Sequence, residues 1–161
     1  MKNNDKITMT VGQLKKLVKE STENEDMFTI YNNTLVDYTG DEEHIKIPYG
    51  VKEIGGWVFQ DCTGLKSVEI PTSVEKIGDG AFKDCISLKS ITIPNSVMII
   101  SPYAFSKSGL TSIKIPESVW KIGDGAFEEC QSLSSVKIAS RRASIGAYAF
   151  DECPVSKIEF M

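Results

Sequence analysis

The sequence predicts a β-rich solenoid of the α/β class, in which five short coils stack along one axis. The first observation is a near-constant spacing of prolines, which divides the chain into units of 22 or 23 residues. The second is that each unit ends in alternating apolar and polar residues, as a half-buried strand does. The third is that the apolar residues of one unit have nothing to pack against until a neighbouring unit stacks on them. The five units begin at Pro48, Pro71, Pro94, Pro116 and Ala139.

Each unit is predicted to contain one strand, one turn and one short helical return. In residues 71–93 the strand lies at the end of the unit, where Ile91 and Ile93 point inward and Thr92 points outward. The proline that follows ends the strand, because it has no backbone N–H to donate to a ladder. The middle of the unit, Ile-Gly-x-x-Ala-Phe-x-x-Cys, turns at its glycine and continues as a short helical or 3-10 piece.

The stretch Ile-Gly-Asp-Gly-Ala-Phe occurs twice, at residues 77–82 and 122–127. Its duplication raises the question of a metal or phosphate loop. Three of the five units lack the acid, a calcium loop needs several oxygen ligands within one turn, and an aspartate repels phosphate. We therefore interpret the stretch as a tight turn. In it, Gly78 supplies an unusual backbone angle, Asp79 caps the helical return, and Gly80 leaves room for the aromatic residue of the next coil.

Stacking places equivalent residues of successive units over one another in columns. Each large apolar side chain buried in a column contributes roughly 1.5–3 kcal/mol. We interpret the cysteine column as small buried hydrophobes, because parallel side chains suit a disulfide badly and the usual zinc-ligand spacing is missing. The columns are Phe59, Phe82, Phe105, Phe127 and Phe150; Leu65, Leu88, Leu110, Leu133 and Val155; and Cys62, Cys85, Ser108, Cys130 and Cys153.

The repeated pattern Leu-x-x-Val-x-Ile-Pro-x-x-Val-x-x-Ile-Gly-x-x-Ala-Phe-x-x-Cys resembles the BspA-type leucine-rich repeat, and the resemblance covers residues 45–160. The lead-in at residues 27–48 is similar to the hairpin that often begins such arrays. This family is common in bacterial surface proteins and in some parasitic protists. The resemblance implies a horseshoe-type leucine-rich-repeat solenoid whose parallel sheet lines one face, and a role in protein recognition or adhesion. It implies no catalytic residues.

The chain is expected to contain three segments. Residues 1–26 form an N-terminal arm. Residues 27–47 form a capping hairpin, which turns at the pair Asn32 and Asn33, and the first strand. Residues 48–161 form the leucine-rich-repeat solenoid.

The two ends of the chain carry separate predictions. The arm contains an amphipathic helix over about residues 10–21, and Thr10 and Gln13 have the spacing of a capping box. We interpret this helix as a cover for the first coil, with an arm that grips a partner or a second copy as the alternative. The C-terminal coil has no cap of its own, so a homodimer through that coil or through the N-terminal helix is a second hypothesis.

Composition excludes several classes of partner. The chain has 161 residues with 18 basic and 22 acidic side chains, and this net charge of −4 argues against nucleic acid and anionic membranes as partners. No apolar run has the length of a signal peptide or of a membrane span, so membrane insertion is not predicted. As written, the sequence predicts a cytoplasmic protein, or a surface or secreted one if an export signal precedes it. His44 is the single histidine, and we predict no catalytic residues, no metal site and no cofactor.

Three groups of residues are candidates for binding a partner. The outward strand positions form a polar stripe of mixed sign, which is either a solvated face or a docking surface. Exposed apolar residues in contact often mark an interface, although aromatic rings packed locally over glycine would explain part of this group. An arginine in the slot of the repeat valine must reach solvent or pair with an acid. The groups are Lys46, Glu69, Lys114 and Lys137; Met98, Ile99, Tyr103 and Trp120; and Arg141 and Arg142.

The sequence therefore predicts a non-enzymatic protein–protein interaction module that docks on a rigid solenoid surface. One alternative is a BspA-like surface adhesin that binds a host or extracellular protein. A second alternative is a small intracellular inhibitor of a larger enzyme, such as a viral or mobile-element protein.

Overall fold

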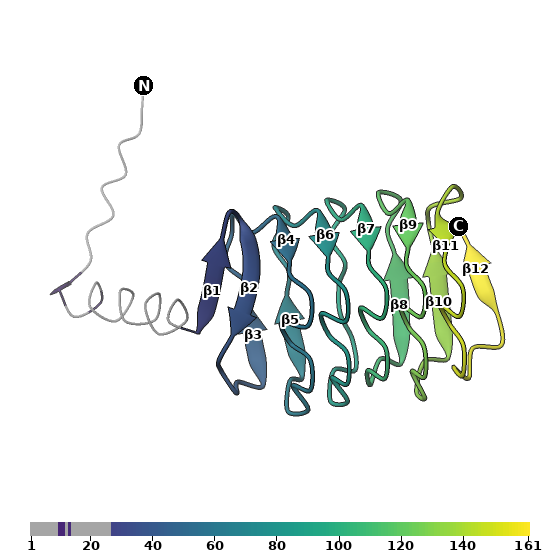
Figure 1. Cartoon of the computed structure of the whole chain (residues 1–161), viewed down its shortest axis with the longest axis horizontal. Helices are drawn as coiled ribbons and strands as arrows, with labels where there is room; N and C mark the ends of the chain where they lie inside the picture. The colour runs from purple at the N-terminus through teal and green to yellow at the C-terminus, as the bar shows by residue number, and fades with distance from the viewer. Residues whose placement is uncertain (1–9, 12, 14–26) are drawn as a thin grey trace, which may run out of the picture.

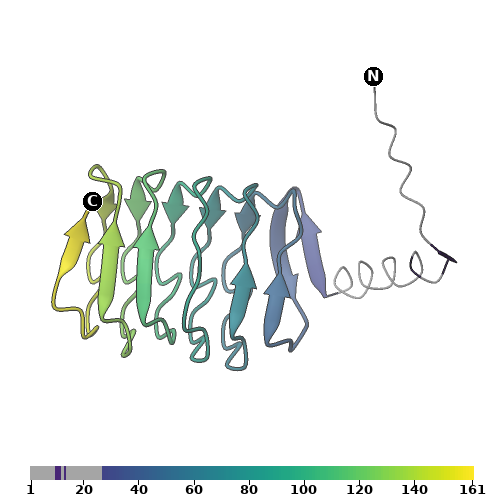
Figure 2. The same ribbon diagram turned by 180° about the vertical axis from the view of Figure 1, so that it is seen from behind.

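The chain forms a stack of coils along the long axis of the molecule (Figures 1 and 2). The structure is a computed structural model and describes residues 10, 11, 13 and 27–161. None of the helical residues within these ranges forms a segment of the length and apolarity that crossing a bilayer requires.

The N-terminal arm is described only at the start of its predicted helix. The Thr10 N–H donates to the Gln13 side-chain oxygen at 2.8 Å, and the Gln13 N–H donates to the Thr10 hydroxyl at 3.2 Å. These reciprocal bonds confirm the capping box. The rest of the helix predicted over residues 10–21, and its predicted role as a cover for the first coil, lie outside the described residues.

Every coil passes through a sheet of very short strands, which we call the short-strand sheet. It contains β1 (Phe28–Tyr31), β2 (Thr34–Tyr38), β4 (Glu53–Ile54), β6 (Lys76–Ile77), β7 (Ile99–Ile100), β9 (Lys121–Ile122) and β11 (Ser144–Ile145). Its order is β1-β2-β4-β6-β7-β9-β11, and all neighbours except β1 and β2 are parallel. Because β2 pairs in parallel with β4, the hairpin supplies a coil of its own. The prediction of five coils was therefore one too few, since the parallel strands from β2 to β11 belong to six coils.

The outward strand positions lie on a second face, which we call the strand face. It contains β3 (His44–Lys46), β5 (Ser67–Glu69), β8 (Ser112–Ile115), β10 (Ser135–Ile138) and β12 (Ile158–Phe160). These strands form a two-stranded parallel sheet, β3-β5, and a three-stranded parallel sheet, β12-β10-β8. The strand predicted at Ile91 to Ile93 is not formed, although Ile93 is buried and Thr92 is exposed as expected. The predicted parallel sheet is thus present, in two parts, and a second parallel sheet accompanies it.

The predicted helical return is wrong, and two successive turns take its place. In the unit of residues 71–93, Gly80 and Asp84 have positive φ angles of 57° and 60°, so a left-handed residue interrupts the chain twice. The Phe82 N–H donates to the carbonyl oxygen of Ala104 in the following coil at 2.7 Å. A helix would need that N–H for its own fourth preceding carbonyl. Bonds between coils therefore replace bonds within a helix.

The core is built from the predicted columns. Phe59, Phe82, Phe105 and Phe127 are fully buried, and their rings stack with centroid separations of 5.0, 5.3 and 5.3 Å. Tyr38 of the hairpin continues the column, with its ring centroid 5.0 Å from that of Phe59. The hairpin turn has positive φ at both asparagines, 49° and 61°, as a two-residue hairpin of this kind requires. The hairpin therefore closes the front of the core, as predicted.

The cysteine column packs in the core as the sequence predicted, although Cys62 and Cys153 at its ends are only partly buried. All four are free, and Cys85 and Cys130 are fully buried. The Cys85 thiol donates to the Phe59 carbonyl oxygen at 3.1 Å, and the Cys130 thiol donates to the Phe105 carbonyl oxygen at 3.0 Å. Burial raises the pKa of the Cys85 thiol, which keeps it protonated and able to donate.

The glycines of the Ile-Gly-Asp-Gly stretch have different roles from those predicted. Gly78 has no positive φ; it is required because a Cβ there would lie 2.6 Å from the Ile54 carbonyl oxygen of the adjacent coil. Gly80 is the residue in the left-handed conformation. It makes room for the ring of Trp57, which belongs to the preceding coil and not to the next one.

The aspartate of this stretch also acts between coils. The Asp124 carboxylate accepts a hydrogen bond from the Ala147 N–H of the next coil at 2.9 Å. The prediction that the acid caps a helical return within its own coil was therefore wrong, because there is no such return to cap. Its carboxylate helps to hold the last two coils in register.

Candidate protein-interaction surface

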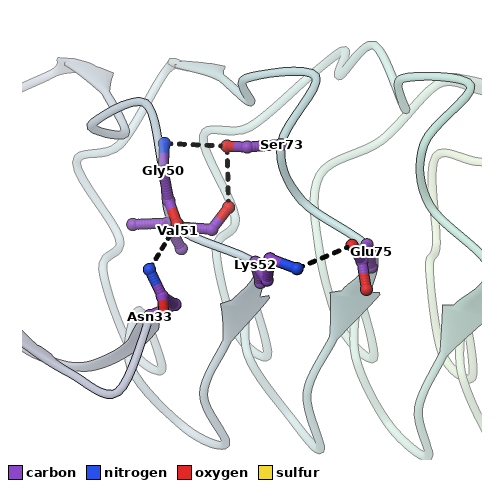
Figure 3. A network of polar contacts seen from close by, with 6 residues as sticks. All are labelled: Asn33, Gly50, Val51, Lys52, Ser73 and Glu75. Carbon is purple, nitrogen blue, oxygen red and sulfur yellow. Dashed lines mark hydrogen bonds and ion pairs between the residues drawn. The ribbon is translucent and has the colours of Figure 1, made fainter.

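The loops that run from each proline, or from Ala139 in the last coil, to the following short strand lie side by side and are joined by backbone hydrogen bonds. We call their exposed side the loop face. It contains residues 49–52, 72–75, 95–98, 117–120 and 140–143. Near the hairpin, polar groups of this face bind one another across adjacent loops (Figure 3). The Ser73 hydroxyl accepts from the Gly50 N–H at 3.0 Å and donates to the Val51 carbonyl oxygen at 2.8 Å. The Lys52 ammonium lies 3.5 Å from the Glu75 carboxylate.

The chemistry of the loop face changes toward the C-terminal coils. Met98 and Trp120 occupy the slot that holds Lys52 and Glu75 in the earlier coils. Their exposed fractions are 40% and 52%, and the Trp120 N–H donates to the Met98 carbonyl oxygen at 3.0 Å. This bond joins the two backbones and places Met98 and Trp120 on adjacent coils. The stacking of their side chains stays a prediction. Ile99 follows as the first residue of β7 and is half-buried.

The last coil carries two arginines at loop positions that are serine and valine in the three coils before it. Ser73 and Ser118 each donate to a carbonyl oxygen of the preceding loop, at 2.8 and 2.7 Å. The valine Val119 is fully buried, whereas Arg142 in the equivalent slot is exposed. Arg142 thus reaches solvent, one of the two outcomes that the sequence predicted. Arg141 takes the serine slot and is exposed as well.

An open groove of about 750 Å³ joins Trp120 to these arginines. The Arg141 Nε donates to the Met161 carbonyl oxygen at 3.4 Å, which brings the end of the last coil to the groove wall. Neither arginine pairs with an aspartate or glutamate side chain among the residues that the structure describes. The groove is lined by Glu117, Trp120, Ala139, Ser140, Arg141, Arg142 and Met161.

Most of the predicted binding residues on the strand face form ion pairs between adjacent strands. Lys46 pairs with Glu69 at 2.9 Å, and Lys137 pairs with Glu159 at 3.6 Å. Lys114 lies beside Lys137 in the parallel register and forms no ion pair with a described residue. Exposed pairs of this kind contribute little to stability, but they neutralise the charges that a partner would need.

The strand face also holds a contact that sequence reasoning missed. His44 Nδ1 and the Ser67 hydroxyl lie 2.7 Å apart, because the parallel register places these residues side by side. The signal was available, since the two residues occupy the same slot one repeat apart. Glu43 forms an ion pair with Lys66 at 2.7 Å, and this contact holds the pKa of the carboxyl below its usual range. The Ser67 and His44 pair thus lacks the orienting acid of a hydrolytic triad among the described residues.

Tyr103 lies apart from the groove. Its ring packs over Gly125, where a Cβ would meet the ring at 2.6 Å, in the same way that the Trp57 ring covers Gly80. The Lys83 ammonium lies 5.8 Å from the centroid of the Trp57 ring. The alternative that the sequence left open, an aromatic ring packed locally over a glycine, therefore applies to both Tyr103 and Trp57.

The chain is similar in sequence and in fold to known leucine-rich repeat proteins. Residues 29–159 match a family model described as the BspA type leucine rich repeat region, in six copies, which agrees with the six coils of the structure. The fold is similar to a leucine-rich repeat protein of T. pallidum, with 28% identity, a TM-score of 0.77 and coverage of 83% of this chain and 68% of that one.

Two further solved structures resemble this chain. One is a leucine-rich cell surface protein from Faecalibacterium prausnitzii, with 32% identity and a TM-score of 0.74. The match covers 83% of this chain and 37% of that protein. The other is the pneumococcal vaccine antigen PcpA, with 26% identity and a TM-score of 0.66. The match covers 81% of this chain and 34% of that protein. The chain thus spans about a third of these two proteins. Comparison with curated protein sequences gave no match.

Proposed function

The chain belongs to the BspA-type leucine-rich repeat family, and from this premise we propose that it is a non-enzymatic module that binds a protein through the C-terminal half of its loop face. The leucine-rich repeat fold is commonly a protein-interaction or surface module. The observation that carries the proposal is the exposed pair Met98 and Trp120, which lies beside a groove with Arg141 and Arg142. Tryptophan and arginine are enriched among the residues that dominate binding energy, and rigid presentation limits the entropy lost on docking.

Affinity capture from the native cell, or from its host, tests this proposal. The chain and a Met98→Ala/Trp120→Ala variant are used as baits, with Lys114→Glu/Lys137→Glu on the strand face as the matched control. Loss of a buried aromatic anchor costs at least about 2 kcal/mol, so recovery of the partner should fall more than tenfold for the loop-face variant alone. Equal recovery by all three baits would reject the loop face as the binding surface, and loss by the control alone would transfer the site to the strand face.

A surface location with binding to a host or extracellular protein is the second candidate function. It is supported by the names of two similar structures, a cell surface protein and a vaccine antigen. Protease treatment of intact native cells tests the location. Digestion of the protein on intact cells is expected for a surface protein, and protection until lysis would favour the alternative of an intracellular inhibitor.

We also propose that the last coil associates with a second copy of the chain. Its support is the exposed apolar surface of that coil, where Ile145 is 38% exposed and Phe160 is 57% exposed. The alternative contact, through the N-terminal helix, involves residues outside those described.

A further inference from the structure

We infer that the groove beside Trp120 binds an acidic segment of the partner, with carboxylates on Arg141 and Arg142 and an apolar side chain against Trp120 and Met98. This inference rests on the proposed function and specifies the chemistry of the partner.

The first argument is the state of the charges. Six lysines of the described solenoid form ion pairs with a glutamate from another coil, including Lys52 with Glu75 and Lys76 with Glu53. Neither groove arginine pairs with an aspartate or glutamate side chain among the described residues, although Glu117 also lines the groove and the chain as a whole is acidic, with a net charge of −4. The Arg141 Nε donates to the Met161 main-chain oxygen, and Arg142 forms no described side-chain bond. Guanidinium groups bind carboxylates through paired hydrogen bonds, so two adjacent ones suit a segment that carries more than one acid.

The second argument is the cost of placing arginines at these positions. Val74, Val97 and Val119 are fully buried in the slot that Arg142 occupies, so the last coil gives up a core side chain. The serine slot supplies a bond between loops in two earlier coils, and Arg141 replaces that serine. Both side chains are exposed. Arg141 gains the bond to the Met161 main-chain oxygen, and Arg142 gains no ion pair or hydrogen bond with a described residue. Residues that depart from a repeat at a cost to packing are typical of functional sites.

The third argument distinguishes a peptide from other anions. The arginines share their groove with Trp120. Met98 is exposed in the equivalent slot of the adjacent coil, outside the groove lining. A nucleic acid would require a wider basic footprint than two arginines, particularly on a chain of net negative charge. A peptide that combines acids with an apolar residue uses both halves of the surface. The groove volume of about 750 Å³ suits a few side chains.

Titration with a defined peptide tests the inference. The full chain is prepared with Trp57→Phe, which leaves Trp120 as the single tryptophan. Its fluorescence is followed on addition of acetyl-Glu-Asp-Leu-Phe-Asp-Glu-amide and of the neutral counterpart acetyl-Gln-Asn-Leu-Phe-Asn-Gln-amide. We expect saturable binding of the acidic peptide, at least about tenfold tighter than the neutral one and weakened by added salt. Arg141→Ala/Arg142→Ala should abolish this preference, whereas the control Lys114→Ala/Lys137→Ala should retain it.

Equal binding of the two peptides, or a preference that survives loss of both arginines, would overturn the inference. Tighter binding of a single-stranded oligonucleotide of the same charge would also overturn it. Partner capture separates this inference from the proposed function. Capture that needs Met98 and Trp120 but tolerates Arg141→Ala/Arg142→Ala rejects the acidic segment and leaves the proposed function standing, whereas capture that tolerates loss of all four rejects the proposed function itself.

Discussion

Each phenylalanine in the middle of the central column contacts one ring above it and one below. The rings of Phe82, Phe105 and Phe127 are nearly parallel, with interplanar angles of 6° and 7°. Stacked rings at this separation contribute about 0.5–1.5 kcal/mol beyond the burial of their surface. Phe150 is at the end of the column, is only partly buried, and contacts the Phe127 ring alone among the described rings. Position along the column therefore decides how much a ring stabilises the fold.

The first prediction compares a central ring with the terminal one. Phe105→Ala should lower the free energy of unfolding by about 3–5 kcal/mol, because it leaves a cavity that the stacked coils cannot fill. Phe150→Ala should cost clearly less, since its side chain is already in part exposed. Urea unfolding of both variants measures the difference. A loss below about 1 kcal/mol for Phe105→Ala would contradict a core built from these columns.

A second residue-scale feature is the column of left-handed residues before each phenylalanine. Its members have φ angles between 57° and 63°, and aromatic residues alternate with glycine. The alternation has a steric cause, because the Trp57 ring occupies the space that a side chain at Gly80 would need. The column is Trp57, Gly80, Tyr103, Gly125 and Tyr148.

The second prediction uses this column. Gly80→Ala should destabilise the protein by more than about 1 kcal/mol, because alanine is strained at φ 57° and its methyl group meets the Trp57 ring. Gly64→Ala is the matched control, since a Cβ there has no atom within 4 Å. Thermal and urea unfolding measure both variants. Removing the ring in a Trp57→Ala/Gly80→Ala double variant should recover part of the loss, and equal effects of the two glycine substitutions would contradict the steric explanation.

Among the elements, the β1–β2 hairpin forms the front end of the solenoid. Tyr38 at the end of β2 lies 5.4 Å from Phe28 and 5.0 Å from Phe59, measured between ring centroids. Its hydroxyl donates to the Glu42 carboxylate at 2.6 Å. Burial raises the pKa of the Tyr38 hydroxyl, and the hydrogen bond to Glu42 raises it further. The Tyr38 ring therefore packs the hairpin against the next coil, and its neutral hydroxyl holds the loop that follows β2.

The third prediction is a pH dependence that belongs to this hairpin. A pKa raised in the folded state contributes stability that is fully present below the pKa of an unfolded tyrosine, about 10, and is lost as the pH rises toward the folded pKa. Tyr38→Phe should lower the stability at neutral pH and make its decline above about pH 10 shallower. Urea unfolding across a pH series measures the decline, and tyrosinate absorbance locates the titration. Parallel curves for the chain and the variant would show that Tyr38 does not contribute.

At the scale of the whole molecule, the last coil differs from the coils that it extends. Ile122 is 1% exposed between its neighbours, whereas the equivalent Ile145 is 38% exposed. β11 and β12 each pair on one side only within the described sheets, so their other edges present unpaired backbone groups. An exposed apolar end beside two open strand edges is a surface that a second coil would complete.

The fourth prediction concerns this end. We expect concentration-dependent self-association of the chain in sedimentation equilibrium, and Ile145→Lys/Phe160→Lys should abolish it by placing charges in the contact. Tyr49→Lys is the control, because Tyr49 is 82% exposed in the first proline loop, far from the last coil along the chain. A monomer at every concentration would refute the association, as would an effect of the control equal to that of the double variant.

The sequence by itself determined which side chains enter the core and at which spacing. The repeat of 22 or 23 residues places Phe, Leu and Cys in fixed slots, and a chain with this period buries them by stacking. The turn at Asn32 and Asn33 and the capping box at Thr10 were also readable, because both depend on neighbouring residues alone. Features of local chemistry were therefore predictable.

Only the tertiary structure decided the features that depend on contact between coils. The segment before each cysteine forms turns and not a helix, because N–H groups such as that of Phe82 find carbonyl oxygens in the next coil. The pairing of Lys46 with Glu69 and the meeting of Trp120 with Arg141 in one groove depend in the same way on stacking residues that lie far apart in the chain. The repeat predicts which slots become neighbours, but the backbone path between them settles whether two side chains pair, pack or stay open to a partner.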